Sequence, residues 1–236
     1  EFRRVLFRSP RRKDIIRSFT LHGGLQHAAH SLAGLPEIEL RTGIEVRSIQ
    51  QNGRLFELTT AAGEVLQCEQ LTLATPPGIA GSLLTDVDEA LSGTLNEVKS
   101  VNINSTGVVV RKENTSLPPV AGLIGLDDVF YSAVSRDIVP HPHYRGFSFH
   151  FPQQVDEGDR IKTIESTLGT AHFEAVFHVS HKLPSPRAGH HELVERITNL
   201  ADTAQITLVG NYFEGLAIED CVQQSFQRAA RLLGTS

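Results

Sequence analysis

The sequence has few or none of several residue types that form disulfides, bind metals or mark the start of translation. Its 236 residues include no methionine, no tryptophan and only two cysteines. Cys68 and Cys221 stand far apart, which matches neither a disulfide framework nor a zinc-binding spacing. No histidine cluster has metal-ligand spacing either, so no metal site is expected. Because even an initiator methionine is missing, we expect residue 1 not to be a natural start.

Long apolar runs and an excess of positive charge are missing as well. No apolar run reaches the roughly 18 residues that a membrane-spanning helix needs, so no transmembrane segment is expected, and only peripheral membrane association stays open. The formal net charge is -5, which argues against a nucleic-acid-binding surface, because such a surface is basic. The composition is that of a globular protein, for which a cytoplasmic location is the default expectation.

The first nine residues, EFRRVLFRS, differ in character from the rest of the chain. They resemble the translation of a sequencing adapter, and we expect residues 1–9 to be an artefact outside the fold. A basic N-terminal arm or an arginine-rich targeting peptide is the alternative. On the first interpretation the natural sequence begins near Pro10, within a gene.

The remaining chain predicts strands that alternate with helices. Asn52-Gly53 predicts a hairpin between strands 44–49 and 55–60. The segment from Leu71 is apolar on both faces, which is typical of a buried parallel strand. Helical periodicity covers residues 25–35, 79–98, 156–168, 190–201 and 217–233, and further strands are expected over 38–41, 65–68, 101–110, 121–134, 146–151, 173–179 and 205–209.

The tail of the chain carries the most informative local pattern. The strand 205–209 leads through the glycine-bounded turn GNYFEG into the last helix. Such a turn can bind a phosphate or cofactor, because a helix start presents unpaired N–H groups and a partial positive charge. Taken alone, the same pattern also occurs as a purely structural turn.

The order of the motifs is more informative about the protein family than any single motif. GGLQ precedes a helix, a three-stranded meander closes with LTLATPP, and GNYFEGLAIEDCV forms the tail. In this order they resemble the C-terminal half of the flavin amine oxidase superfamily, with its protoporphyrinogen oxidases, over residues 18–236. The resemblance implies a C-terminal fragment of an FAD-dependent oxidoreductase, since the fingerprint G-x-G-x-x-G of the family is absent from the chain.

The fold that the resemblance implies is α/β, with two interleaved parts. An incomplete, doubly wound FAD-binding domain would take residues 18–78 and 203–236. A substrate domain with a mixed or antiparallel sheet would take residues 79–202. The activity implied is removal of a hydride from a C–H or C–N bond, with porphyrinogen oxidation first, carotenoid or terpenoid desaturation and amine oxidation as alternatives. A binding module that shares only the strand–turn–helix tail is the non-enzyme alternative.

The resemblance also implies cofactor-binding positions. Val46 would meet the adenine through its backbone, and the helix that begins near Ala217 would lie beneath the flavin, where its dipole stabilises the negative charge of the reduced ring. The full set is Val46, Ala74, Thr75, Pro76, Gly210, Asn211, Gly215, Ala217 and Ile218. Asn211 stands where the family often has an acid, and Phe226 where it often has a small residue.

Substrate-binding candidates come from two strands. Arg136 could bind a carboxylate, with Tyr131 nearby, although pairing with Asp137 or another surface acid is the simpler expectation. His150 alternates with two phenylalanines and could line a cavity. Residues 102–107 contain no lysine, whereas many amine-oxidising relatives have one in that strand, which favours a porphyrinogen oxidase or a desaturase. No general base is assigned, because the flavin itself accepts the hydride.

Overall fold

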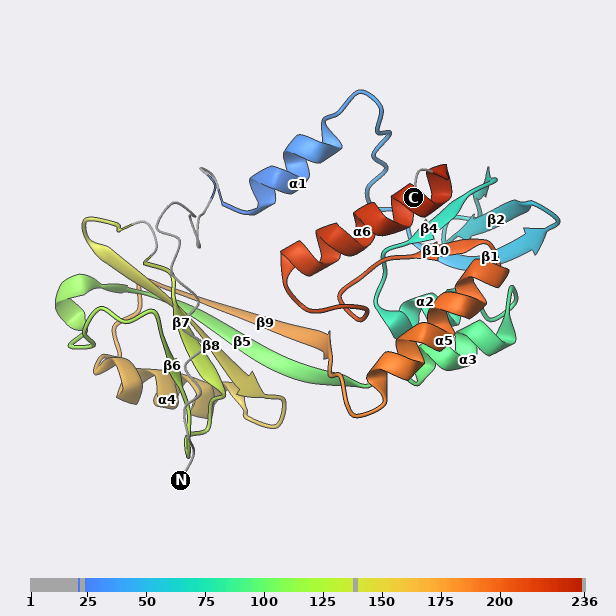
Figure 1. Ribbon diagram of the computed structural model, residues 1–236. Coiled ribbons are helices and arrows are strands. Elements are labelled where there is room, and N and C mark those ends of the chain that lie inside the picture. The colour runs from blue at the N-terminus through green and yellow to red at the C-terminus, as the bar shows by residue number, and fades with distance from the viewer. Residues whose placement is uncertain (1–20, 22–23, 138–139, 235–236) are drawn as a thin grey trace, which may run out of the picture. The chain divides into compact units, whose positions relative to one another are not determined.

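The computed structural model describes residues 21, 24–137 and 140–234 (Figure 1). Residues 1–9, which we expect to be adapter-derived, and Gly23 of the glycine pair lie outside this set. The chain divides into two compact units. Unit 1 takes the described residues up to Leu40 together with Asn104–Val179, and unit 2 takes Arg41–Ile103 and the described residues from Ser180 onward.

Unit 2 contains an antiparallel meander. It consists of β1 (Val46–Asn52), β2 (Leu55–Thr60) and β3 (Val65–Cys68), each paired with the next. Asn52 faces Leu55 across a tight turn at Gly53, whose positive φ of 67° suits glycine. The hairpin predicted from Asn52-Gly53 is therefore confirmed.

The second sheet of unit 2 is a pair of short parallel strands. β4 (Leu71–Leu73) and β10 (Ile206–Leu208) are far apart in sequence but pair directly. All four terminal residues of these strands are buried, so the parallel strand expected from the apolar segment at Leu71 is confirmed.

Four helices of unit 2 enclose these strands, namely α2 (Pro77–Leu83), α3 (Glu89–Asn96), α5 (His190–Thr203) and α6 (Ile218–Leu233). The helical pattern predicted over 79–98 is confirmed, but it is divided into two helices, α2 and α3. The second half starts afresh where the Asp88 carboxylate accepts a hydrogen bond from the Leu91 N–H at 2.8 Å, which is a typical N-cap. Leu91, Leu95 and Ile197 are fully buried in one cluster with the parallel strands.

Unit 1 is built on a five-stranded sheet with the order β6-β7-β8-β5-β9. The strands are β5 (Ser100–Arg111), β6 (Gly122–Ile124), β7 (Ser132–Ser135), β8 (Tyr144–Pro152) and β9 (Ala175–Pro184), and a single 3-10 turn, Lys112–Asn114, follows β5. Helix α4 (Glu157–Leu168) lies along one face of the sheet (Figure 1), where Ile164 and Leu168 join a cluster with the phenylalanines of β8. Helix α1 (Gln26–Ala33) has no buried residue.

Two features of the fold differ from the sequence-based expectations. The strand predicted over 38–41 is wrong, since Ile38 and Leu40 are exposed and pair with no strand among the described residues. The boundaries of the compact units fall within β5 and β9 rather than at 78/79 and 202/203, because α2, α3 and α5 pack into the core of unit 2. The division into a cofactor and a substrate domain remains a prediction. The mixed α/β class is confirmed.

None of the helices that the structure describes has the length and the apolar character needed to cross a bilayer.

Candidate functional site

A cavity of about 770 Å³ opens in unit 2 where the two parallel strands end. The chain leaves β4 through Ala74, Thr75 and Pro76, and it leaves β10 through Gly210 and Asn211. The Val209 N–H donates to the Leu73 carbonyl at 3.0 Å, which holds the two exits side by side. The crevice beyond the carboxyl ends of parallel strands is the usual ligand site of open α/β sheets.

The wall of the cavity comes from seven parts of unit 2. Besides the two exits, it includes the start of α2, the end of α3, one residue each from β5 and α6, and the end of β9. The lining residues are Ala74, Thr75, Pro76, Pro77, Gly78, Ile79, Asn96, Ser100, Lys182, Pro184, Gly210, Asn211 and Cys221.

Thr75 contributes a hydroxyl that has no partner. Its Oγ1 atom is fully buried, yet it makes no hydrogen bond in the structure. Leaving a buried hydroxyl unpaired costs about 1–3 kcal/mol. A ligand that accepts or donates a hydrogen bond at this position would remove that cost.

Lys182 supplies the only formal charge among the side chains that line the cavity. Its exposed ammonium group has no acidic partner within the described part of the chain. Asn96, Ser100 and Asn211 add neutral polar groups to the same wall. The cavity is therefore suited to a ligand with negative charge and several hydrogen-bonding groups.

The turn after β10 requires glycine at its first position. Gly210 has a φ of +155°, and a Cβ atom there would lie 2.8 Å from the Tyr212 ring. Tyr212 is held in place because its ring contacts that of Phe213 at a centroid distance of 4.4 Å and its carbonyl lies 2.8 Å from His190 Nε2. The backbone at Gly210 thus borders the cavity without a side chain in the way.

Helix α6 is anchored and capped by polar side chains. Gln224 is buried and donates from Nε2 to the Leu208 carbonyl at 3.1 Å, which fixes the helix on β10. At the helix start, Asp220 Oδ2 accepts from the Ala217 N–H at 3.2 Å. A side chain at Gly215 would collide with this carboxylate, since its Cβ would lie 2.1 Å from Asp220 Oδ2. The glycine is therefore needed by the cap itself.

A second hollow, of about 470 Å³, lies at the opposite ends of the same two strands, next to Gln70 and Gln205. Two of its arginines, Arg228 and Arg231, approach the carboxylate of Asp202, at 3.7 and 3.8 Å. Burial, the main influence on Arg228, lowers the pKa of its guanidinium. The hollow at the carboxyl ends differs in that Lys182 is the one charged side chain in its described lining, which also includes the unpaired Thr75 hydroxyl.

Comparison with known proteins gives matches among solved structures only. No family model matches the chain, and no curated protein matches it in sequence. A candidate protoporphyrinogen oxidase from Exiguobacterium sp. 255-15 superposes with a TM-score of 0.74 at 16% identity, covering 89% of this chain and 51% of the other. Reduced UDP-galactopyranose mutase gives 0.68 at 15% identity, covering 91% and 52%. An engineered putrescine oxidase gives 0.68 at 12% identity, covering 91% and 53%.

These proteins share one architecture. The chain has the fold that these three structures share over the matched region. It spans about half the length of the structures that it matches. The resemblance deduced from the order of the sequence motifs is confirmed at the level of the fold.

This fold brings five of the nine predicted cofactor positions together. Ala74, Thr75, Pro76, Gly210 and Asn211 line the same cavity. The other four do not line it, but first-turn Cys221 does, which places the start of α6 at its wall.

The four remaining predicted cofactor positions lie outside the lining of this cavity. Val46 begins β1 opposite Thr60 and packs partly against the core. Gly215 and Ala217 belong to the cap made by Asp220. Ile218 is 66% exposed. Their predicted contacts with a cofactor remain predictions.

Sequence reasoning missed Lys182, Cys221, Asn96 and Ser100 as cavity residues. Lys182 lies near the end of β9, which continues to Pro184, whereas the sequence predicted that this strand ends at Val179. Residues 178–184 show no apolar–polar alternation and are mostly exposed, so the sequence carried no period-2 signal for this extension of the strand.

The predicted substrate residues all lie in unit 1. Arg136 Nε donates to Ser148 Oγ at 3.0 Å, and Asp137 is paired instead with Arg145 at 2.9 Å. The simpler expectation is thus wrong for the Arg136–Asp137 pair. His150 Nδ1 lies 2.9 Å from Ser105 Oγ on β5. Tyr131 precedes β7 and is 50% exposed.

Proposed function

We propose that the chain forms part of an FAD-dependent oxidoreductase and that the cavity at the ends of β4 and β10 receives part of the cofactor. The observation that carries the proposal is the buried, unpartnered Thr75 hydroxyl in a cavity at the carboxyl ends of parallel strands. The shared fold supports it, because the structures that the chain matches include a candidate protoporphyrinogen oxidase and a putrescine oxidase. When bound, FAD would supply the acceptor of the substrate hydride.

The lining residues suit the polar parts of such a cofactor. Gly210 leaves room for a ligand to approach the backbone, and the Asn211 amide can donate and accept hydrogen bonds. Thr75 offers a hydroxyl that would lose its burial penalty on binding. Lys182 would place a positive charge against phosphate or other anionic groups of the cofactor. Val46 and the α6 start, with Gly215, Ala217 and Ile218, remain further proposed contacts.

The two cysteines provide a direct test of this site. Cys221 lines the cavity, whereas Cys68 ends β3 and does not line it. We expect FAD to slow alkylation of Cys221 and to leave alkylation of Cys68 unchanged. Single-cysteine variants, Cys68→Ser and Cys221→Ser, allow each rate to be followed by mass spectrometry on the full chain.

Riboflavin and ADP provide controls for this experiment, because each carries one part of FAD. Weaker protection by both than by FAD would support a site that uses the whole cofactor. Equal alkylation of Cys221 with and without saturating FAD, together with unchanged FAD fluorescence, would contradict the proposal.

For the whole protein, we infer porphyrinogen oxidation as the reaction. The high TM-score to a candidate protoporphyrinogen oxidase supports it, as does the lack of a lysine over residues 102–107. Carotenoid or terpenoid desaturation and amine oxidation are the alternatives. Anaerobic bleaching of the bound-flavin absorbance by a porphyrinogen, but not by putrescine, is the expected result. Bleaching by putrescine alone would favour amine oxidation over porphyrinogen oxidation.

A cytoplasmic location is part of the same proposal. Cofractionation of the protein with membranes would instead indicate peripheral association. Protection of Cys221 by FAD without any reaction with porphyrinogen, polyene or amine would favour a binding module over an enzyme.

A further inference from the structure

Strand β9 forms one edge of the unit 1 sheet. In the strand order β6-β7-β8-β5-β9, its one strand neighbour within the described chain is β5. Backbone N–H and C=O groups on the outer side of an edge strand have no partner in the sheet, so they can pair with another strand. The part of β9 that belongs to unit 1, Ala175–Val179, is therefore open to pairing with a further strand.

The same segment lacks the features that protect edge strands from pairing. Natural edge strands are commonly short, bulged, covered, or interrupted by a charge or a proline. Residues 175–179 have the sequence AVFHV, which contains no proline, lysine, arginine or acid. Val176, Phe177 and Val179 are 37%, 60% and 49% exposed, so the described part of the chain leaves the segment uncovered.

The opposite edge of the sheet is better protected. Strand β6 has only three residues, Gly122–Ile124, and so offers few backbone groups, although Ile124 is 79% exposed. A very short edge strand is one of the devices that prevent association between sheets. Because each copy of the chain then has a single unprotected edge in this sheet, pairing between two such edges would stop at two copies.

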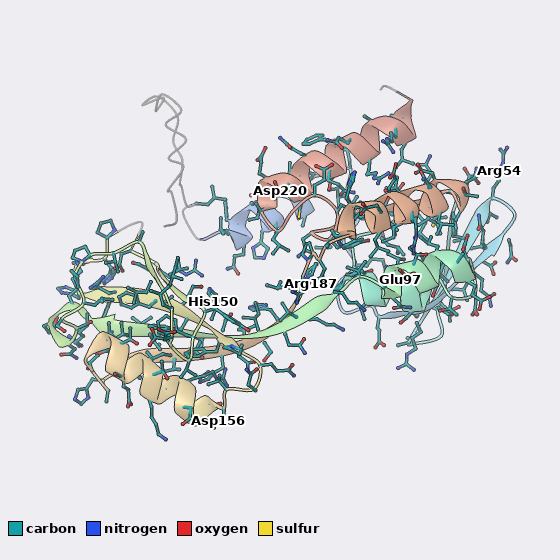
Figure 2. The ribbon with its side chains drawn as sticks, turned by 60° about the horizontal axis from the view of Figure 1, so that its bottom comes forward. Arg54, Glu97, His150, Asp156, Arg187 and Asp220 are labelled. Atoms are coloured by element: carbon teal, nitrogen blue, oxygen red, sulfur yellow. The ribbon has the colours of Figure 1, made fainter. Side chains whose placement is uncertain are left out.

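His178 is held on the side of the sheet that α4 covers. Its Nδ1 lies 3.2 Å from Thr106 Oγ1 on β5, and its Nε2 lies 3.4 Å from Glu157 Oε1 in the first turn of α4. Figure 2 labels Asp156, which caps the start of this helix. Because side chains alternate along a strand, Phe177 and the residues two places before and after it belong to the opposite face.

The segment is self-complementary about Phe177. In an antiparallel pair with Phe177 on the two-fold axis, Ala175 of each copy would face the partner's Val179, and the two Phe177 rings would face each other. On the α4 side, Val176 would face the partner's His178. Each of these pairs is apolar or joins an apolar side chain to an imidazole, so no like charges meet.

We propose that two copies of the chain associate by antiparallel pairing of their β9 edges, centred on Phe177, so that the two unit 1 sheets become one continuous sheet. The pairing satisfies the outer backbone groups of both strands and buries Phe177, the most exposed apolar side chain of β9. The partner is a second copy, because a two-fold axis brings the same uncharged segment from both sides. The inference is independent of the proposed function, since residues 175–179 do not line the cavity at the ends of β4 and β10.

The oligomeric state of the full chain tests the proposal. Because the paired segments are short, we expect a weak, reversible dimer that forms between about 1 and about 100 µM in sedimentation velocity. Phe177→Lys should weaken the association at least about tenfold, because two like charges would meet at the axis. Ile124→Lys is the matched control, since it places the same charge on an exposed side chain of the other edge, and it should leave the association unchanged.

Disulfide cross-linking tests the register of the pair. In a chain that carries Cys68→Ser and Cys221→Ser, Phe177→Cys should form a linked dimer with oxidised glutathione. Directly opposite residues of antiparallel strands have Cα atoms about 4.5–5.5 Å apart, which a disulfide can span. Val176→Cys should link more slowly, because the residue opposite it is the partner's His178.

Hydrogen exchange of the unmodified chain gives a measurement without any substitution. The peptide that covers residues 175–179 should exchange more slowly as the protein concentration rises, whereas the β6 peptide should not change. A chain that stays monomeric at about 100 µM would overturn the proposal, and so would equal dimerisation after Phe177→Lys. Cross-linking at Val176→Cys as fast as at Phe177→Cys would overturn the register. A thermal melt of Phe177→Lys that matches the unmodified chain excludes unfolding as the cause of a lost dimer.

Discussion

Unit 1 and unit 2 enclose cores of different chemistry. In unit 1 the rings of Phe130, Phe149 and Phe151 contact one another, with centroids 5.4 to 6.3 Å apart. In unit 2 the core is mainly leucine and isoleucine from two sheets and three helices. The aromatic core belongs to a single sheet with one helix on it, whereas the aliphatic core must fill the space between several elements.

The two units also treat buried polar groups differently. In unit 1 the guanidinium of Arg145 is fully engaged, by Asp137 and by the carbonyls of Leu117 and Pro118. In unit 2 three buried side-chain atoms of the described chain have no hydrogen-bond partner, in Thr75, Tyr212 and Gln224. Among the described residues, the buried side-chain atoms without a partner therefore belong to unit 2, where a ligand could satisfy them.

The largest effect is expected from Phe149→Ala. This side chain is fully buried and contacts two other rings, so its loss should lower the free energy of unfolding by about 3–5 kcal/mol. Hydrogen exchange should accelerate in peptides of unit 1 and stay slow in those of unit 2.

Phe226→Ala is its control, because Phe226 is 73% exposed. This change should alter the free energy of unfolding by no more than about 0.5 kcal/mol. Equal acceleration of exchange in both units after Phe149→Ala would mean that the two cores unfold as one.

Asp137→Asn should destabilise unit 1 by about 3 kcal/mol, because it leaves the Arg145 charge, whose side chain is 10% exposed, without its counter-charge. Burial by itself would raise the pKa of the Asp137 carboxyl. Hydrogen bonds from Arg145, Ser135 and the Gly146 backbone outweigh it, so the pKa lies below its ordinary value of 3.8.

The pH dependence of unfolding checks this assignment. Because the pKa of Asp137 is lower in the folded than in the unfolded state, its contribution is present above about pH 4 and is lost as the pH falls through the folded value. Urea titrations from pH 6 to pH 3 should show a steeper acid limb for the unmodified chain than for Asp137→Asn. Identical acid limbs would exclude Asp137 as a contributor.

Thr75→Val should weaken FAD binding about fivefold, since one hydrogen bond to the ligand is lost. The same change should leave the free energy of unfolding equal or higher, because the buried hydroxyl has no partner in the free protein. Thr72→Val is the matched control, since Thr72 lies exposed on β4 and does not line the cavity. A loss of stability in Thr75→Val, with unchanged FAD affinity, would indicate a purely structural role.

The smallest effect is expected from Tyr212→Phe. The ring is 1% exposed and its hydroxyl is unpartnered, and burial, the main cause, raises the pKa of the phenol far above its usual range. Removing the hydroxyl should raise the free energy of unfolding of unit 2 by up to about 1 kcal/mol. A thermal melt measures this, and destabilisation would reveal a partner for the hydroxyl, such as a bound water molecule.

Local sequence patterns predicted most of the individual elements. The alternation in β8, the turn at Gly53 and the glycine that ends α4 each depend on a few neighbouring residues. A prediction was wrong where a pairing partner distant in sequence determines whether the element forms. Ile38 and Leu40 alternate with polar residues as a strand would, but they have no strand beside them. The division of the helical segment 79–98 is a different case, because the Asp88 cap that starts α3 is a local signal, three residues from its partner Leu91.

In helix α6 the sequence pattern did not predict which side of the helix is buried. Its sequence is amphipathic, and the pattern alone favours burial of the apolar side. In the structure Gln224 is the buried residue, while Ile218 and Phe226 are 66% and 73% exposed. The hydrogen bond from Gln224 to β10 decides which side faces the unit.

The sequence by itself determined the types of most elements, the order of the motifs and the kind of fold that this order implied, because these depend on short-range periodicity and turn chemistry. Only the tertiary structure decided that Thr75, Lys182 and Asn211 share one cavity and that Arg136 stands unpaired beside Ser148. These juxtapositions join residues separated by tens of positions in the chain. They follow from strand pairing and helix packing, which no local pattern in the sequence specifies.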